Sequence, residues 1–259
     1  MRRLPLLICL AVLSQQALAQ NQPAQLTPTQ QKIQQLLTSA IRTPEEKARD
    51  RERNPVATLG FFGIREDMKV LELMPGGGWY TKILGPLLRD KGELYIVDPD
   101  YYVTRTEPIL SLPGMDKIKK LEWGKWDGQL DPNVRSFPPP GKWAVKDLDM
   151  VLTFRNYHNF SVPARAVLNK NVFDALKPGG LYAIKDHTRR HMEPDSPENG
   201  RRVDPVQLIK EVQQAGFVFV DYSRLHYKPD DELRYEVGRA SVTGNTDRFT
   251  MIFKKPETR

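Results

Sequence analysis

The sequence contains a single cysteine among its 259 residues, Cys9. This residue lies in an N-terminal segment that has a basic start at Arg2 and Arg3, an apolar stretch and small residues at Ala17 and Ala19. That layout is typical of a secretory signal peptide. We therefore expect residues 1–19 to be cleaved during export to the periplasm, which leaves a mature chain without cysteine. No disulfide would support its fold.

Long apolar runs are absent after residue 19, so no transmembrane segment is expected once the signal is removed. The net charge is +7, and +5 without Arg2 and Arg3. Basic residues alternate with acidic ones, as in residues 45–53, and the sequence has neither zinc-finger spacing nor an aromatic-basic RNA-binding pattern. Nucleic acid is therefore not expected as a partner.

Apolar segments with the length of strands alternate with helical patterns over residues 61–259. Strands are predicted at 70–73, 93–100, 148–154, 181–186, 217–222 and 248–255, with a short one near 121–123. This alternation predicts one α/β domain, with a Rossmann-like, doubly wound and mostly parallel sheet and a possible antiparallel pair at the end. Residues 20–60 are expected to form a flexible lead-in and an N-terminal helical appendage, in which Thr43 and Glu46 form a capping box.

Two segments interrupt the regular pattern. Pro86 falls inside the helix expected after residue 79 and should kink or shorten it. Residues 101–146 contain the run "SFPPPGKW", which is incompatible with a helix or a central strand. Apart from the short strand near 121–123, this segment is expected to be a long surface excursion.

Three consecutive glycines, Gly76, Gly77 and Gly78, follow the first expected strand and precede a helix. Glycines at such a junction let a ligand approach the backbone, and the free N–H groups at the start of a helix favour negative charge. Asp98, at the end of the next strand, would lie on the same rim and accept hydrogen bonds from a ribose. A glycine turn after the first strand, followed by an aspartate at the end of the second, predicts a nucleoside-type ligand.

The dinucleotide fingerprint G-x-G-x-x-G fails here, because its third glycine position is Thr81 when counted from Gly76. The stretch instead resembles the first motif of the class I S-adenosylmethionine (SAM)-dependent methyltransferases. In this resemblance Glu72 is the acidic residue, Gly76 and Gly78 are the second and third glycines, and Met74 replaces the first. The runs "PGGGWYT", "RNYHN" and "TDRFTMIFKKP" look like those of an exported bacterial subgroup of predicted methyltransferases.

The resemblance implies SAM as the cofactor, held by Glu72, the glycines and Asp98, with Trp79 at its flank. Residues after the fourth and fifth strands would face the methyl acceptor, which is a small molecule or of unknown kind. Asn156 would hydrogen-bond this acceptor, and His158 would act as a general base. His187 is a further candidate.

Other interpretations of the same residues stay open. His187 and His191 have metal-ligand spacing for a helix, but Pro194 and Pro197 make a helix unlikely there, so no metal site is predicted. A non-catalytic exported module that binds a nucleoside-type ligand is the first alternative to an enzyme. A nicotinamide-dependent oxidoreductase is the second. The sequence does not predict the oligomeric state.

Overall fold

The computed structural model describes residues 25–131 and 136–257. The expected signal peptide and Cys9 lie outside these residues. Within the described chain, no helix has the length and apolar character needed to cross a membrane.

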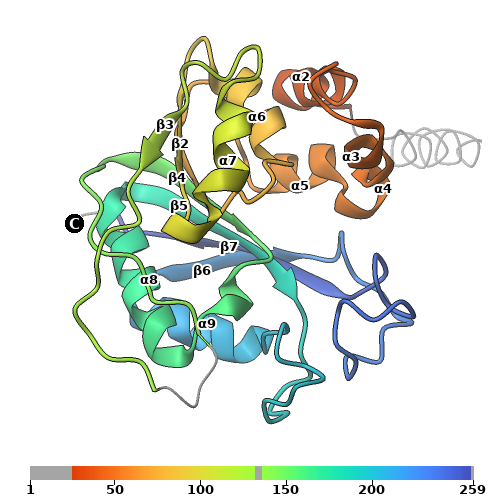
Figure 1. The fold of residues 1–259 in the computed structure, drawn as a ribbon, viewed down its shortest axis with the longest axis vertical. Helices are drawn as coiled ribbons and strands as arrows, with labels where there is room; N and C mark the ends of the chain where they lie inside the picture. Colours follow the sequence, from red (N-terminus) through yellow and green to blue (C-terminus); the bar gives the residue numbers. More distant parts are fainter. Residues whose placement is uncertain (1–24, 132–135, 258–259) are drawn as a thin grey trace, which may run out of the picture.

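One sheet organises the molecule, with its seven strands in the order β3-β2-β1-β4-β5-β7-β6 (Figure 1). Strands β1 to β5 are parallel to one another, and β7 is antiparallel to both β5 and β6. The strands are β1 (Lys69–Leu73), β2 (Glu93–Val97), β3 (Lys119–Leu121), β4 (Leu148–Phe154), β5 (Leu176–His187), β6 (Val218–Ser223) and β7 (Arg248–Lys254). The expected fold class is confirmed, including the antiparallel pair.

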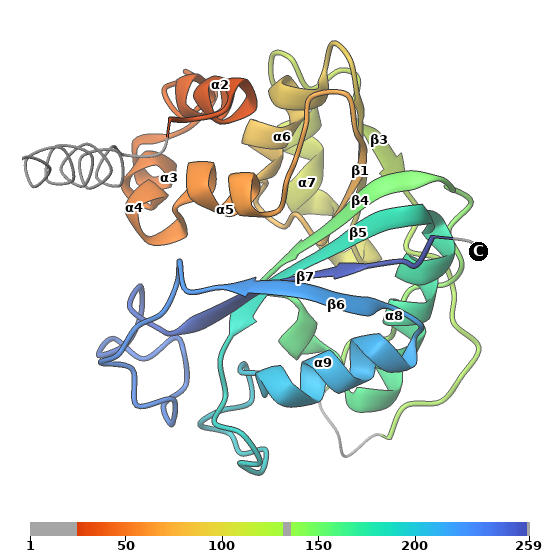
Figure 2. The ribbon, with the colours of Figure 1, turned by 180° about the vertical axis from the view of Figure 1, so that it is seen from behind.

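Helices cover both faces of this sheet (Figures 1 and 2). The helices are α2 (Pro28–Leu36), α3 (Pro44–Ala48), α4 (Asp50–Arg53), α5 (Pro55–Phe61), α6 (Thr81–Leu88), α7 (Val103–Leu110), α8 (Val162–Ala175) and α9 (Pro205–Gln214), with short 3-10 turns η1 (Asp100–Tyr102) and η2 (Tyr157–Asn159). Helices α8 and α9 lie on one face, and α2, α5 and α6 lie on the other. The layers are those of a doubly wound fold.

Successive side chains of β1 point to opposite faces of the sheet and pack against the helices on each face. Leu71 and Leu73 are buried in the cluster that contains α8 and α9. Val70 is buried in the opposite cluster, which contains α6. Glu72 is the one acidic residue in this strand, and its position two residues after Val70 directs its side chain toward α6.

Helix α3 begins where its capping signal predicted. Thr43 forms a capping box with Glu46 at the start of α3, and Pro44 occupies the first turn. Ile33 of α2 is fully buried against Leu59 of α5 and the α6 side of the core. Helix α6 ends after eight residues and carries Pro86 inside it, as the proline predicted.

The expectation of a surface excursion over residues 101–146 is wrong in part, because α7 (Val103–Leu110) lies within it. Its sequence mixes polar residues with a proline, so its apolar spacing is too weak to identify a helix. Tertiary contacts stabilise it instead: Ile109 is buried against the glycine turn, and Thr106 hydrogen-bonds Asp98. Trp123 and Trp143, which also lie in the segment, are buried.

Candidate functional site

The glycine turn leaves β1 with the backbone in the left-handed region at alternate residues. The φ angles of Met74, Gly76 and Gly78 are 52°, 56° and 71°. Met74 therefore adopts the conformation that the glycine of the family motif would favour, at a cost of roughly 1–2 kcal/mol for a residue with a Cβ atom. A hydrogen bond from its amide to the Val97 carbonyl (2.8 Å) holds it against β2.

The three glycines have different surroundings. A Cβ atom added at Gly76 or Gly77 would meet no atom within 4 Å, so these two backbones are open to a ligand. A Cβ atom at Gly78 would lie 2.3 Å from Cδ1 of Ile109. Gly78 therefore allows α7 to pack closely on the turn, a role that the sequence did not reveal.

Glu72 lies beneath the turn and is 2% exposed. The hydroxyl of Thr81 donates a hydrogen bond to its Oε2 atom (2.7 Å). Burial, with a smaller contribution from nearby Asp98, raises the pKa of Glu72 to about 8. The carboxyl is therefore mainly protonated at neutral pH, and it ties β1 to the start of α6.

Asp98 follows β2 and has a different environment. Its Oδ2 atom accepts a hydrogen bond from the Thr106 hydroxyl, whereas Oδ1 is buried and has no hydrogen-bond partner. Burial raises the pKa of Asp98 to about 6, against the opposing effects of the Thr106 hydroxyl and of the Gly76 amide, which lies near the carboxylate but does not meet the geometry of a hydrogen bond to Oδ1. Buried polar atoms are rarely left unpaired, so Oδ1 is a candidate acceptor for a ligand hydroxyl.

A cavity of about 240 Å³ adjoins Asp98 at the carboxyl ends of β2 and β3. It is lined by Asp98, Asp100, Lys120, Leu121, Glu122 and Trp123. Ligands of open parallel sheets bind at this edge. Lys120 and Leu121 of β3 were not predicted as site residues, although the position of this strand beside β2 was an available signal.

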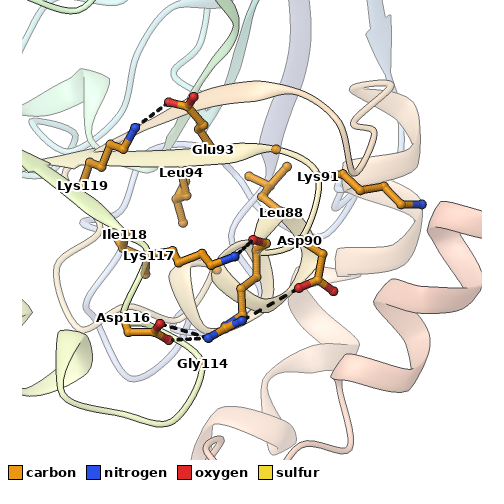
Figure 3. Close-up of a pocket in the computed structure, with 13 residues that line it drawn as sticks. Leu88, Asp90, Lys91, Glu93, Leu94, Gly114, Asp116, Lys117, Ile118 and Lys119 are labelled. Atoms are coloured by element: carbon orange, nitrogen blue, oxygen red, sulfur yellow. Dashed lines mark hydrogen bonds and ion pairs between the residues drawn. The ribbon is translucent and has the colours of Figure 1, made fainter.

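A larger cavity, of about 490 Å³, lies at the opposite end of the same strands, between the end of α6 and the start of β3 (Figure 3). Its charged side chains satisfy one another. Arg89 bonds both carboxylate oxygens of Asp116 at 2.9 Å, and Lys119 bonds Glu93 at 2.9 Å. This cavity is at the amino ends of the strands, and none of its described lining residues has a buried side-chain polar atom without a partner, so we place the site at Asp98.

Trp79 and Asn156 brace the turn from two sides. The Trp79 indole donates to the Glu46 carbonyl (2.9 Å), and its ring lies beneath the guanidinium of Arg53 (4.5 Å to the centroid). The Asn156 amide donates to the carbonyls of Leu73 (3.3 Å) and Met74 (3.1 Å). The loop after β4 is thereby joined to the end of β1, which brings Asn156 to the site.

His158 lies on η2 with one ring nitrogen held by a buried carboxylate. Its Nδ1 atom is 2.7 Å from Oδ1 of Asp186, and its backbone amide donates to Oδ2 (3.0 Å). A carboxylate partner favours the proton on Nδ1, which leaves Nε2 as an acceptor. No hydrogen bond joins Nε2 to another residue within the described ranges. This geometry suits a general base.

Both ring nitrogens of His187 are occupied by neighbours. Nε of Arg155 lies 3.0 Å from Nε2, and the Thr246 hydroxyl lies 2.9 Å from Nδ1. Because arginine only donates, Nε2 accepts and the proton is on Nδ1. Burial and the adjacent arginines hold the pKa of His187 well below its ordinary value. His191 is far more exposed and pairs with Asp204 (2.8 Å).

Four basic residues that were not predicted as site residues lie near these histidines. Arg155 follows β4, and its amide bonds the Lys185 carbonyl of β5 (2.7 Å). Arg248 begins β7 opposite His187. Arg53 ends α4, and its carbonyl accepts from Nζ of Lys185 (3.4 Å). We refer to Arg53, Arg155, Lys185 and Arg248 as the basic cluster.

The described residues contain no group of three or more histidine, cysteine or acidic side chains able to hold a metal ion. The site is therefore an open glycine backbone, an aspartate with one unpaired oxygen beside a cavity, a histidine oriented by a carboxylate, and a cluster of two buried and two half-buried cations.

Comparison with known proteins places the fold. No protein-family model matches the sequence, and no curated protein matches it. A SAM-dependent methyltransferase from Aquifex aeolicus is 18% identical, with a TM-score of 0.54 over 87% of this chain and 98% of its own. One from Methanosarcina mazei is 16% identical, with a TM-score of 0.51 over 77% of this chain and 97% of its own.

The [4+2]-cyclase SpnF is similar to the same degree, at 14% identity and a TM-score of 0.54 over 80% of this chain and 81% of its own. The chain thus has the Rossmann-like α/β fold of SAM-dependent methyltransferases. Because a cyclase also has it, the fold does not determine the reaction, which has to be argued from the site.

Proposed function

We propose that the protein is a SAM-dependent methyltransferase that acts on a small-molecule acceptor. The observation that carries this proposal is the unpaired, buried Oδ1 atom of Asp98, beside a cavity and the open backbones of Gly76 and Gly77. A carboxylate in this position would accept hydrogen bonds from a ribose, and glycines without nearby atoms leave room for the rest of the cofactor. The residues present therefore fit this cofactor.

Each residue of the site has a role in this proposal. Gly76, Gly77 and Asp98 bind the cofactor, which supplies a methyl group on an electrophilic sulfonium. Glu72, Gly78, Trp79 and Asn156 keep the turn in its bound shape through the contacts described above. Orientation of the two reactants is the main contribution of such a site.

His158 is the general base in this proposal. Its Nε2 atom accepts the proton of an acceptor O–H or N–H group, and the Asp186 carboxylate stabilises the imidazolium that results. We do not assign this task to His187, whose two nitrogens are engaged. His187 instead orients Arg155.

The cofactor site is tested by calorimetric titration of the mature protein with S-adenosylhomocysteine. We expect Asp98→Ala to weaken binding at least tenfold, because a hydrogen bond to a charged group contributes roughly 1.5–3 kcal/mol. Asp90→Ala, an exposed carboxylate at the opposite end of the sheet, is the matched control and should bind normally. Equal affinities for both variants and the wild type would remove Asp98 from the site.

The reaction is tested by transfer of a labelled methyl group from SAM into a periplasmic extract. His158→Gln should bind S-adenosylhomocysteine like the wild type and label the acceptor roughly 10²–10⁴-fold more slowly. Tight binding by the wild type without labelling above the Asp98→Ala variant would instead support the non-catalytic binding module.

We also propose that the chain is exported and works in the periplasm, as the exported bacterial subgroup that it resembles would. The support is the N-terminal segment with Arg2, Arg3 and the Ala17–Ala19 site. Mass spectrometry of the protein recovered from the periplasm should give an N-terminus at Gln20. A product that retains Cys9 would contradict this proposal.

A further inference from the structure

The basic cluster has more positive charge than its surroundings balance. Arg53 forms no side-chain hydrogen bond or ion pair with any residue in the described ranges, and contacts only the rings of Trp79 and Tyr80. Its Nε atom is buried without a partner. The guanidinium of Arg155 donates from Nε to a neutral histidine, His187. Within the described residues neither arginine forms an ion pair with a carboxylate, although Glu52 and Asp186 offset part of their charge through space.

Arg248 has no close carboxylate partner among the described residues, and Glu52 and Asp186 offset its charge only through space. Its Nη2 atom is 3.9 Å from Oε2 of Glu52, and its Nε atom is buried and unpaired. Arg49 already bonds the same carboxylate at 2.9 Å. Lys185, buried behind the arginines, donates to the Tyr80 hydroxyl (2.7 Å) and lacks an acidic partner within the described chain.

Asp186 offsets part of this charge through space, but hydrogen bonds from other residues already engage its oxygens. Its carboxylate accepts from the amide and ring of His158 and from the amide of His187 (2.7 Å). Burial and the mutual repulsion of these cations lower the pKa of Arg53 to about 10, and they lower the pKa of Arg155 and Lys185. A bound anion would relieve this repulsion.

The cluster is also next to the proposed base. The rings of His158 and His187 are 6.0 Å apart, and Arg155 bonds His187 directly. Arg155 has a φ of 65°, a conformation that arginine seldom adopts and that often marks functional positions. Arg248 is 4% exposed, so the surface available suits a small anion better than a macromolecule.

We propose that the methyl acceptor carries an oxyanion, a carboxylate or a phosphate, which Arg53, Arg155 and Arg248 bind beside His158. The planar guanidinium matches both groups through paired N–H donors. The proposal rests on the methyltransferase function and specifies its substrate class. An anionic acceptor held by the cluster would present its nucleophile to Nε2 of His158.

The test uses inorganic phosphate and succinate as probes, each titrated calorimetrically into the mature protein saturated with S-adenosylhomocysteine. Succinamide, which lacks the charge, is the control ligand. We expect at least one anion to bind and succinamide not to bind. Arg53→Gln and Arg155→Gln should each weaken anion binding at least tenfold. Arg65→Gln, which removes an exposed charge before β1, should leave it unchanged.

Arg53→Gln keeps the backbone carbonyl of Arg53, which accepts its hydrogen bonds from other residues, and removes the contacts of the guanidinium with the rings of Trp79 and Tyr80. Thermal unfolding without ligand checks each variant. Anion binding that survives both Arg53→Gln and Arg155→Gln in folded protein would overturn the proposal.

A second arm identifies the source of the anion, since the cofactor also carries a carboxylate. S-adenosylhomocysteine has this group and 5′-methylthioadenosine lacks it. Arg53→Gln could weaken the binding of S-adenosylhomocysteine tenfold and leave that of 5′-methylthioadenosine unchanged. If no free anion binds either, the basic cluster holds the carboxylate of the cofactor, and the acceptor proposal is wrong. If the wild type binds phosphate but neither adenosine compound, the result supports the anion site and contradicts the proposed methyltransferase function.

Discussion

Two carboxylates flank the glycine turn, and their surroundings give them different tasks. Glu72 has its hydrogen bond from Thr81 and points into the layer beneath α6. Asp98 keeps one oxygen buried and unpaired beside a cavity. An unpaired buried oxygen costs free energy in the absence of a ligand, and a ligand hydroxyl recovers that cost. Asp98, rather than Glu72, is therefore the carboxylate that we expect to bind the ligand.

The buried carboxyl of Glu72 predicts a pH dependence of stability. Its folded pKa is about 8, above the ordinary 4.5. A carboxyl with a raised pKa stabilises the fold fully below its unfolded pKa, and this contribution is lost as the pH rises through the folded pKa. Between about pH 5 and pH 8, the free energy of unfolding of the wild type should therefore fall relative to that of Glu72→Gln, by up to roughly 1.4 kcal/mol per pH unit.

Denaturant unfolding of both proteins across this pH range provides the measurement. Glutamine keeps an oxygen to accept from Thr81 and cannot ionise, so it isolates the titration of Glu72 from all other groups. A difference in stability that does not change with pH would show that Glu72 ionises normally.

At the scale of elements, the turn is a junction between β1, α6 and α7. Gly77 has open space beside it and its φ is not positive, whereas Gly78 has a φ of 71° and Ile109 against it. Gly77→Ala should leave stability nearly unchanged and weaken S-adenosylhomocysteine binding, because its methyl group fills space meant for the ligand.

Gly78→Ala should act on the fold instead. We expect a loss of about 2–4 kcal/mol, from overpacking against Ile109 and from the left-handed backbone. Thermal unfolding and titration of both variants separate the two effects, and Ile109→Ala in the Gly78→Ala background should restore part of the stability. Equal behaviour of the two glycine variants would contradict the assignment of separate roles.

The sequence indicated the parts of the fold whose signals are local. Strand periodicity placed β1, β2 and β4, and the capping box at Thr43 placed the start of α3. Helix α7 was not predicted, because contacts with Gly78 and Asp98, rather than local sequence signals, stabilise it. Asp98 and His158 could be placed from their positions after strands. The basic cluster could not, because Arg53 and Arg155 meet only when an N-terminal helix folds over the sheet.

For the molecule as a whole, the N-terminal helices are an integral part of the core. Ile33 and Leu59 are fully buried against the α6 layer. The carbonyl of Arg53 accepts hydrogen bonds from Lys185 in the sheet and from His226 near the C-terminus (3.0 Å). The helices therefore connect distant parts of the chain as well as covering one face.

This arrangement predicts that residues 61–259 do not form a stable domain by themselves. Truncation of a buried leucine or isoleucine typically costs 2–5 kcal/mol, and a whole domain is stable by only about 5–15 kcal/mol. Removal of α2 to α5 takes away several such side chains together with the acceptor for Lys185 and His226. We expect the 61–259 fragment to lack a cooperative thermal transition by circular dichroism, and residues 25–259 to show one.

Ile33→Ala should lower the free energy of unfolding by about 2–5 kcal/mol, while Gln34→Ala, exposed on the same helix, should not. A 61–259 fragment that unfolds cooperatively and binds S-adenosylhomocysteine normally would show that the helices are dispensable, and that the anion site containing Arg53 was added to a complete fold.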